Sequence, residues 1–196
     1  ELPKVFEAAV PQWAQYFDFD LAETEDWNVI AFVMDRKQRF ADLGLLPDFL
    51  PPFANGYSVG KVLWLYEQPS DYYRRHLLLH EGVHAFMRYA FGDCGPPWYM
   101  EGMAELLATH RWQDGTLEVP HFPQSREEAP MWGRVKILRD ALAEDEALDW
   151  EAVLALDPTA HRQVDAYGWS WAACVLLEQD PRFHKRFRQV PSLLGL

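Results

Sequence analysis

The spacing of apolar residues predicts mixed α and β elements in the first third of the chain. Residues 2–17 have apolar side chains at helical intervals, interrupted by Pro11. Residues 27–35, "WNVIAFVMD", are rich in branched and aromatic side chains, which is typical of a β-strand. The chain is therefore expected to begin with a broken helix followed by a strand.

The next segments continue this alternation. A short helix is expected over residues 36–44, and a proline-rich loop follows it. Residues 57–68 alternate between apolar and polar side chains well enough to predict one or two strands that turn near Gly60. These strands complete a small α/β region.

From Ser70 onward the pattern is helical. Ser70 or Asp71 is suited to cap a helix that stops at Gly92, and apolar residues occupy nearly every side of it, so we expect a core helix. Prolines suited to a first turn precede a second helix over residues 98–112. Further helices are expected over residues 131–145, 149–156, 163–179 and 181–187.

These elements predict an α+β fold in a single domain spanning residues 1–196. A small mixed sheet is expected in the α/β part, residues 1–68, and a mainly helical part follows over residues 69–196. The length suits one hydrophobic core, and the sequence shows neither an internal repeat nor a long linker.

Composition narrows the functional classes. Hydrophobic residues make up 49% of the chain and aromatic residues 15%, which indicates a globular protein. The formal net charge of −12 argues against nucleic acid as a partner, because binding phosphates requires a basic face. No apolar run is long enough to span a bilayer, and no signal peptide is visible. The chain does not begin with Met, which leaves export after removal of a leader open beside a cytoplasmic location.

Two cysteines, Cys94 and Cys174, allow at most one internal disulfide. Two buried thiols are the simpler interpretation. A disulfide between the loop after Gly92 and the helix over residues 163–179 is the alternative.

The segment "HLLLHEGVHAFM" carries the most specific chemical signal. On an α-helix, residues four apart lie about 6 Å apart on one face, so His80 and His84 can direct their imidazoles to one point. Glu81 lies about 100° around the helix, where it can take a proton from a metal-activated water. The alternative is a core helix whose histidines are satisfied by other partners.

A catalytic zinc site needs a third protein ligand. Ala90 stands where a third histidine would lie in the metzincin pattern, so that class is excluded. His80-Glu81-Gly82-Val83-His84, followed by "WYMEGMAE" at residues 98–105, resembles the gluzincin signature. This stretch is most similar to the catalytic core of the aminopeptidase N and leukotriene A4 hydrolase group, and to the related peptidase-MA-like domains. The resemblance implies a zincin-like fold, Zn²⁺ as the cofactor and Glu101 as its third ligand.

Other acidic and histidine residues near this motif are expected to have supporting roles. Glu105 lies one helical turn after Glu101, where it can accept the second N–H of a ligating histidine; a solvated charge is the alternative. Asp93 could compete as a ligand, but a carboxylate after a glycine is more often a turn residue. His76 lies about 12 Å along the helix axis from His84, too far to share an ion, and is interpreted as structural.

The same resemblance implies a tyrosine that stabilises the oxyanion formed during hydrolysis. Tyr167 stands at a comparable distance after Glu101, and His161 is a second candidate donor. A core tyrosine with one satisfied hydroxyl group is the alternative interpretation of Tyr167.

The chain also departs from the family. Its exopeptidases recognise the free amine of a substrate through a Gly-x-Met-Glu-Asn motif, and the equivalent region here reads "FANGYSVGKVLWLYEQ". This departure favours an endopeptidase-like enzyme over an aminopeptidase. An edge strand within residues 57–67 could still pair with an extended peptide through its backbone.

Three hypotheses follow. The first is a zinc metallopeptidase that acts on a peptide or protein substrate, with Glu81 as general base and Tyr167 assisting. The second is a zinc-binding domain without catalytic activity that serves binding or assembly. The third is a metal-free helical fold in which the motifs are incidental. The sequence does not indicate an oligomeric state.

Overall fold

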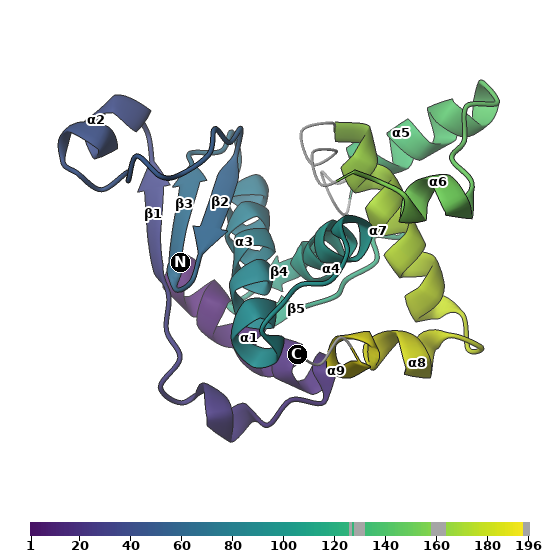
Figure 1. Ribbon diagram of the computed structural model, residues 1–196, viewed down its shortest axis with the longest axis horizontal. Helices are drawn as coiled ribbons and strands as arrows, with labels where there is room; N and C mark the ends of the chain where they lie inside the picture. The colour runs from purple at the N-terminus through teal and green to yellow at the C-terminus, as the bar shows by residue number, and fades with distance from the viewer. Residues whose placement is uncertain (126, 128–131, 158–163, 194–196) are drawn as a thin grey trace.

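The computed structural model describes residues 1–125, 127, 132–157 and 164–193. In Figure 1 a small sheet and the long helix α3 lie on one side, and the helices α5, α6 and α7 lie on the other. Helix α4 lies between them and packs against both α3 and α7. The α+β class predicted from the sequence is confirmed.

The N-terminal sheet is mixed and has three strands. Strand β1 (Ile30–Met34) is parallel to β3 (Val62–Tyr66), and β3 is antiparallel to β2 (Gly56–Val59). The order β1-β3-β2 leaves β2 at an edge, and Figure 1 shows this edge beside α3. The segment over residues 57–68 thus forms two strands, which confirms the turn expected near Gly60.

Helix α1 (Leu2–Phe17) is continuous, so the interruption expected at Pro11 is wrong. Proline removes one backbone hydrogen bond and costs about 3 kcal/mol inside a helix. Burial of the apolar face of α1 offsets that cost, because Val5 and Trp13 are fully buried and Phe17 is nearly so. A 3₁₀ turn (Leu21–Thr24) leads on to β1, and α2 (Lys37–Asp42) follows β1 as expected.

Helix α3 (Asp71–Phe91) matches the predicted core helix closely. The Ser70 hydroxyl group caps it by accepting a hydrogen bond from the Tyr73 N–H, and Gly92 follows its last residue. Its central turns are buried on all sides between α1, the sheet and α4. This burial explains why its apolar residues show little sidedness.

Helix α4 (Pro97–Ala108) is shorter than the predicted helix over residues 98–112. Residues Arg111–Gln113 and Thr116–Glu118 instead form the hairpin β4–β5 around Asp114 and Gly115. Both turn residues have positive φ, which an Asp-Gly pair adopts readily in a two-residue hairpin. The turn preference of Asp114 and Gly115 therefore determines the structure of this segment, although the spacing of Trp112 suits a helix.

The C-terminal half is helical, as expected. It comprises α5 (Trp132–Ala143), α6 (Trp150–Leu154), α7 (Val164–Gln179), α8 (His184–Arg188) and the short α9 (Val190–Leu193), which the sequence did not predict. Helices α4 and α7 approach closely at Gly102, where a Cβ atom would lie 2.5 Å from the Ser170 carbonyl oxygen. A glycine is therefore required for this packing.

Two further sequence questions are answered by the fold. Cys94 and Cys174 are both buried free thiols, so the disulfide considered above is not formed. Among the described helices, none combines the length and the apolar character needed to cross a bilayer.

Candidate metal centre

Helix α3 presents His80 and His84 on one buried face. Their four-residue spacing brings the two Nε2 atoms to 3.2 Å from each other, with the rings nearly perpendicular at 86°. Both side chains are buried. The pair is therefore directed at a single point.

Helix α4 adds a carboxylate at the same point. Glu101 Oε2 lies 3.2 Å from His80 Nε2 and 3.5 Å from His84 Nε2. The packing of α4 against α3 thus brings together the three side chains that the sequence motif proposed as ligands.

The resulting triangle has the size of a tetrahedral zinc site. Bonds of about 2.0–2.1 Å at tetrahedral angles place ligand atoms about 3.3–3.4 Å apart. The three measured edges are 3.2, 3.2 and 3.5 Å. The buried Glu101 Oε2 lies against the two imidazole nitrogens, so its charge has to be neutralised either by protons on the imidazoles or by a cation. These three residues fit a divalent metal.

Electrostatics couples the three side chains strongly. Burial by itself lowers the pKa of His80, but hydrogen bonds and charges from Glu101 and Glu105 outweigh it and raise the pKa to about 10. Burial also lowers the pKa of His84, but the negative charge of Glu101 outweighs burial and raises that pKa to about 9. Burial acts to raise the pKa of Glu101, yet the imidazoles hold it far below its usual range. A metal that binds here must displace protons from the imidazoles.

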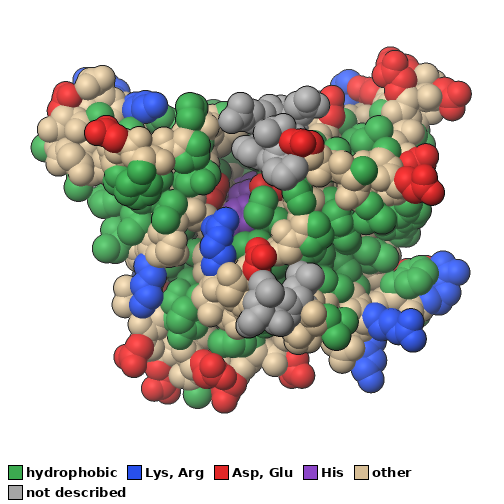
Figure 2. All heavy atoms as spheres, in the orientation of Figure 1, with side chains coloured by type: hydrophobic (Ala, Val, Ile, Leu, Met, Phe, Trp, Pro, Cys, Tyr) green, Lys and Arg blue, Asp and Glu red, His purple; other side chains and the backbone are tan. Residues whose placement is uncertain are grey.

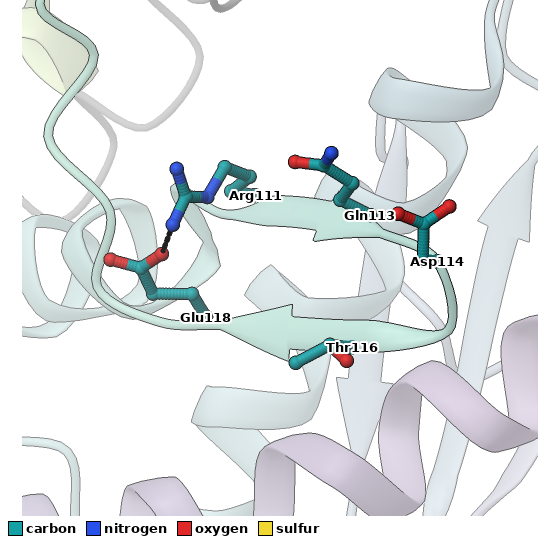
Figure 3. A pocket seen from close by; sticks show the side chains of 5 residues that line it. All are labelled: Arg111, Gln113, Asp114, Thr116 and Glu118. Carbon is teal, nitrogen blue, oxygen red and sulfur yellow. Dashed lines mark ion pairs between the residues drawn. The ribbon is translucent and has the colours of Figure 1, made fainter.

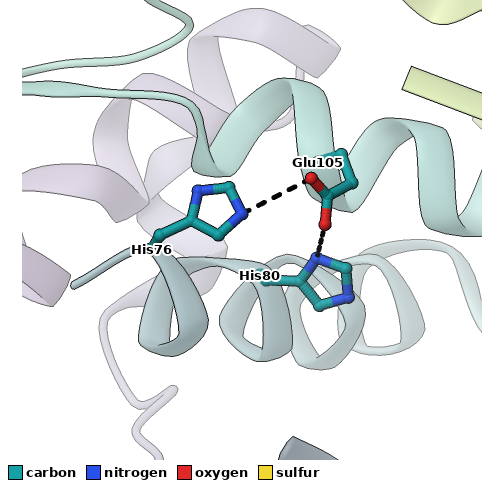
Figure 4. Close-up of side chains that lie close together, drawn as sticks. All are labelled: His76, His80 and Glu105. Atoms are coloured by element: carbon teal, nitrogen blue, oxygen red, sulfur yellow. Dashed lines mark ion pairs between the residues drawn. The ribbon is translucent and has the colours of Figure 1, made fainter. Parts of the chain in front are cut away.

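Glu105 contacts His80 at Nδ1, the ring nitrogen that does not face His84 and Glu101 (Figure 4). Its Oε1 lies 3.2 Å from His80 Nδ1, and because an ionised carboxylate has no proton to donate, Nδ1 is the donor. When a metal displaces the proton of the other nitrogen, His80 Nε2 is therefore the atom that would offer its lone pair. Burial opposes ionisation of Glu105, but Arg134 and His76 hold its pKa well below the usual range.

Arg134, on α5, fixes Glu105 in turn. Its Nη2 lies 3.0 Å from Glu105 Oε1 and its Nε lies 3.2 Å from Oε2, a bidentate pair. This role of Arg134 was not predicted, since Arg134 lies in a segment without a recognisable motif.

His76, His80 and Glu105 form a second group of possible ligands (Figure 4). It suits a metal less well, because Arg134 already occupies both carboxylate oxygens with positive charge. His76 Nδ1 faces the Ala108 carbonyl oxygen at 3.1 Å, and its Nε2 lies 3.5 Å from Glu105 Oε2. These contacts support the structural interpretation of His76.

Tyr167, on α7, lies beside the cluster. Its ring centroid is 5.9 Å from that of His80, and the Arg134 guanidinium carbon lies 5.2 Å from the same centroid. Burial raises the pKa of the phenol, and the charges of Glu101, Glu105 and Glu81 raise it further. Tyr167 therefore stays protonated and can donate a hydrogen bond. His161, the other candidate donor, lies outside the described residues.

Glu81 leaves α3 in a different direction from His80 and His84. It is buried against β2, where Gly56 is its close neighbour. Within the described part of the chain, no hydrogen bond to its carboxylate is formed. Its negative charge contributes to the raised pKa of Tyr167. Glu81 is thus next to the proposed ligands without being one of them.

The remaining candidate does not join the cluster. Asp93 Oδ1 accepts hydrogen bonds from the backbone N–H groups of Cys94 and Gly95, which makes it a turn residue.

His80 and His84 are each 6% exposed, and Glu101 is 9% exposed. Figure 2 shows histidine surface in a hollow on one face of the molecule, with basic, acidic and apolar side chains around it. A depression over the β4–β5 hairpin is lined by Arg111, Gln113, Asp114, Thr116 and Glu118 (Figure 3). It contains none of the clustered histidines.

Comparisons with protein-family models, with curated proteins and with solved structures found no match. The function therefore has to be argued from the geometry of the cluster.

Proposed function

We propose that this protein is a zinc-dependent peptidase. The observation that carries the proposal is the triangle formed by His80, His84 and Glu101, whose edges suit tetrahedral Zn²⁺. Glu81 follows His80 directly on α3, and its carboxylate forms no hydrogen bond within the described residues. Two histidines and one glutamate leave a fourth position for water or substrate. When bound, Zn²⁺ would lower the pKa of water and polarise a substrate carbonyl group.

Glu81 is proposed as the general base. Its carboxylate is buried but has no partner in the described part of the chain, so it is available to accept a proton from the attacking water. The same group can then pass the proton to the leaving amine.

Tyr167 is proposed to stabilise the oxyanion that forms on the substrate. Its raised pKa keeps the hydroxyl group protonated, and its ring centroid lies 5.9 Å from that of His80, which supports a donor on the side of the cluster where a substrate carbonyl group would bind.

The edge strand β2 is proposed to hold the substrate backbone. The Tyr66 N–H donates to the Asn55 carbonyl oxygen at 2.7 Å, so these two residues form a hydrogen-bonded pair. Pairs alternate along an antiparallel ladder, and the backbone groups of Gly56 consequently point away from β3 to the free edge. An extended peptide that pairs there would pass Glu81, which favours cleavage within a chain.

Metal content and turnover together test this proposal. Purified protein should carry about one zinc per chain and lose it to a chelator. Glu81→Gln should keep zinc and thermal stability but lose hydrolysis of a fluorogenic peptide library and of unfolded casein. Glu144→Gln, at an exposed glutamate, is the matched control and should remain active.

The outcomes separate the three hypotheses. Zinc without turnover in the wild-type protein would indicate a binding domain that lacks peptidase activity. A chain that takes up no zinc would be a metal-free helical fold. Turnover that survives Glu81→Gln would overturn the role of Glu81.

A further inference from the structure

Gly56, at the start of β2, makes room for the carboxylate of Glu81. A Cβ atom on residue 56 would lie 2.7 Å from Glu81 Oε1 and 2.9 Å from Glu81 Cγ. Side-chain carbons do not approach other atoms this closely, so any larger residue would displace the Glu81 side chain.

We infer that Gly56 is a positioning residue for Glu81. The Glu81 carboxylate packs directly against the backbone of β2 at Gly56. Because residue 56 has no side chain, the carboxylate can lie this close to the strand. This inference rests on the proposed function of Glu81 as general base.

The backbone conformation does not explain the glycine. Gly56 is not among the glycines with positive φ, and it pairs with Leu65 in a regular antiparallel register. A branched or aromatic residue would suit a strand better, since glycine inside a strand costs about 0.5–1 kcal/mol. The close contact of Gly56 with Glu81 and Leu77 on α3 is therefore what explains a glycine at this position.

Steric contact is also the main restraint that the described residues place on Glu81. Its neighbours on α3, His80 and His84, have polar partners around their rings, whereas no hydrogen bond to the Glu81 carboxylate is formed within the described ranges. A carboxylate positioned by packing alone moves when the residue that it packs against is changed.

Gly56→Ala tests the inference directly. The atoms it would meet are side-chain atoms of Glu81 and Leu77, so β2 and α3 can keep their backbones. We expect unchanged zinc content and a kcat on casein reduced by roughly 100-fold, the cost of a misplacement of about 1 Å. Gly133→Ala is the matched control, because no atom of the described residues lies within 4 Å of a Cβ atom there.

A double substitution identifies the contact responsible. Aspartate at residue 81 is one methylene shorter and avoids the new methyl group, so Gly56→Ala should not lower kcat further in a Glu81→Asp background. If Gly56→Ala lowers the Tm, Glu81→Asp should also restore it. Rescue by Leu77→Ala instead would assign the strain to Leu77 and overturn the inference.

A crystal structure of the Gly56→Ala variant gives a readout that is independent of turnover. The Glu81 carboxylate should be displaced relative to the wild-type protein; an unmoved carboxylate would overturn the inference even if activity were lost. Displacement in a protein whose wild-type form cleaves nothing would support the positional role of Gly56 while rejecting the proposed peptidase function.

Discussion

Glu105 and His80 are linked by a contact of 3.2 Å between Oε1 and Nδ1, on the side of the imidazole that faces away from His84. This contact fixes which nitrogen of His80 carries the proton and therefore which one offers a lone pair. Among the described residues, His80 Nδ1 and two nitrogens of Arg134 contact the Glu105 carboxylate, and His76 Nε2 lies 3.5 Å from its Oε2. The orientation of His80 thus depends on residues that would not touch the metal.

Glu105→Gln should weaken zinc binding by about 10–100-fold, the usual effect of removing a group that orients a ligating histidine. Competition with a chromophoric chelator measures the affinity on the folded protein. Arg134 would lose its buried anionic partner, so the Tm should fall as well. Glu118→Gln, at an exposed glutamate of the β4–β5 hairpin, should leave zinc affinity unchanged.

Tyr167→Phe should lower kcat by about 10²–10³-fold while zinc content stays the same, because the substitution removes a donor needed when negative charge develops on the substrate. The ring contacts with His80 and Arg134 would persist in phenylalanine, so stability should change little. Steady-state kinetics on casein and a thermal melt measure the two effects. Equal turnover by both proteins would show that the hydroxyl group takes no part in the reaction.

His110 should make the protein less stable in acid. Burial and the nearby positive charges of His76 and Arg75 lower its pKa from 6.5 to about 3, against a hydrogen bond to the Ala108 carbonyl oxygen that raises it. The unfolded chain therefore binds a proton at higher pH than the folded protein does. The stabilisation is complete above pH 6.5 and declines as the pH falls from there towards 3, by about 1.4 kcal/mol per pH unit at most.

The contacts of His110 agree with this sign. Arg75 Nε donates to His110 Nε2 at 3.1 Å, and a proton on Nε2 would abolish that bond. Urea unfolding at pH 7 and at pH 5 should show a smaller loss of stability for His110→Gln than for the wild-type protein. An identical loss in both proteins would assign the acid sensitivity to other groups.

Gly102→Ala should destabilise the protein by about 1–3 kcal/mol, because the new methyl group would press on the Ser170 carbonyl oxygen and on the Cys174 thiol. The first contact is with the backbone of α7, so Cys174→Ala should restore only part of the stability. Chemical denaturation of the single and double variants measures this. Full recovery in the double variant would show that the thiol alone limits the approach of α4 to α7.

The parts of the fold with strong local signals were predicted correctly. The cap at Ser70 and the stop at Gly92 define α3, and the alternation around Gly60 gives the hairpin of β2 and β3. At Pro11 and Trp112 the local signals conflicted. Burial of Trp13 and its neighbours determines the first case, and the turn at Asp114 and Gly115 determines the second.

The candidate site also contains residues that the sequence could propose and residues that only the tertiary structure reveals. The spacing within α3 was enough to propose His80 and His84, since a helix repeats regularly, whereas Glu101 was proposed from the resemblance of the two motifs to the gluzincin signature. Arg134 and Gly56 could not be proposed, because their contacts with Glu105 and Glu81 arise from the packing of distant segments. Such contacts follow from the tertiary structure and leave no pattern in the sequence.

The proposed ligands come from two helices that follow one another in the chain, whereas Tyr167 comes from α7 and Arg134 from α5. The cation-binding half of the site is thus built from contacts of low sequence separation and can assemble early during folding. Of the groups proposed to act on the substrate, Tyr167 joins only when the C-terminal helices dock, whereas Glu81 is already present on α3. A folding intermediate without the docked C-terminal helices would thus hold the three proposed ligands and Glu81 but would lack both Tyr167 and the Arg134 partner of Glu105.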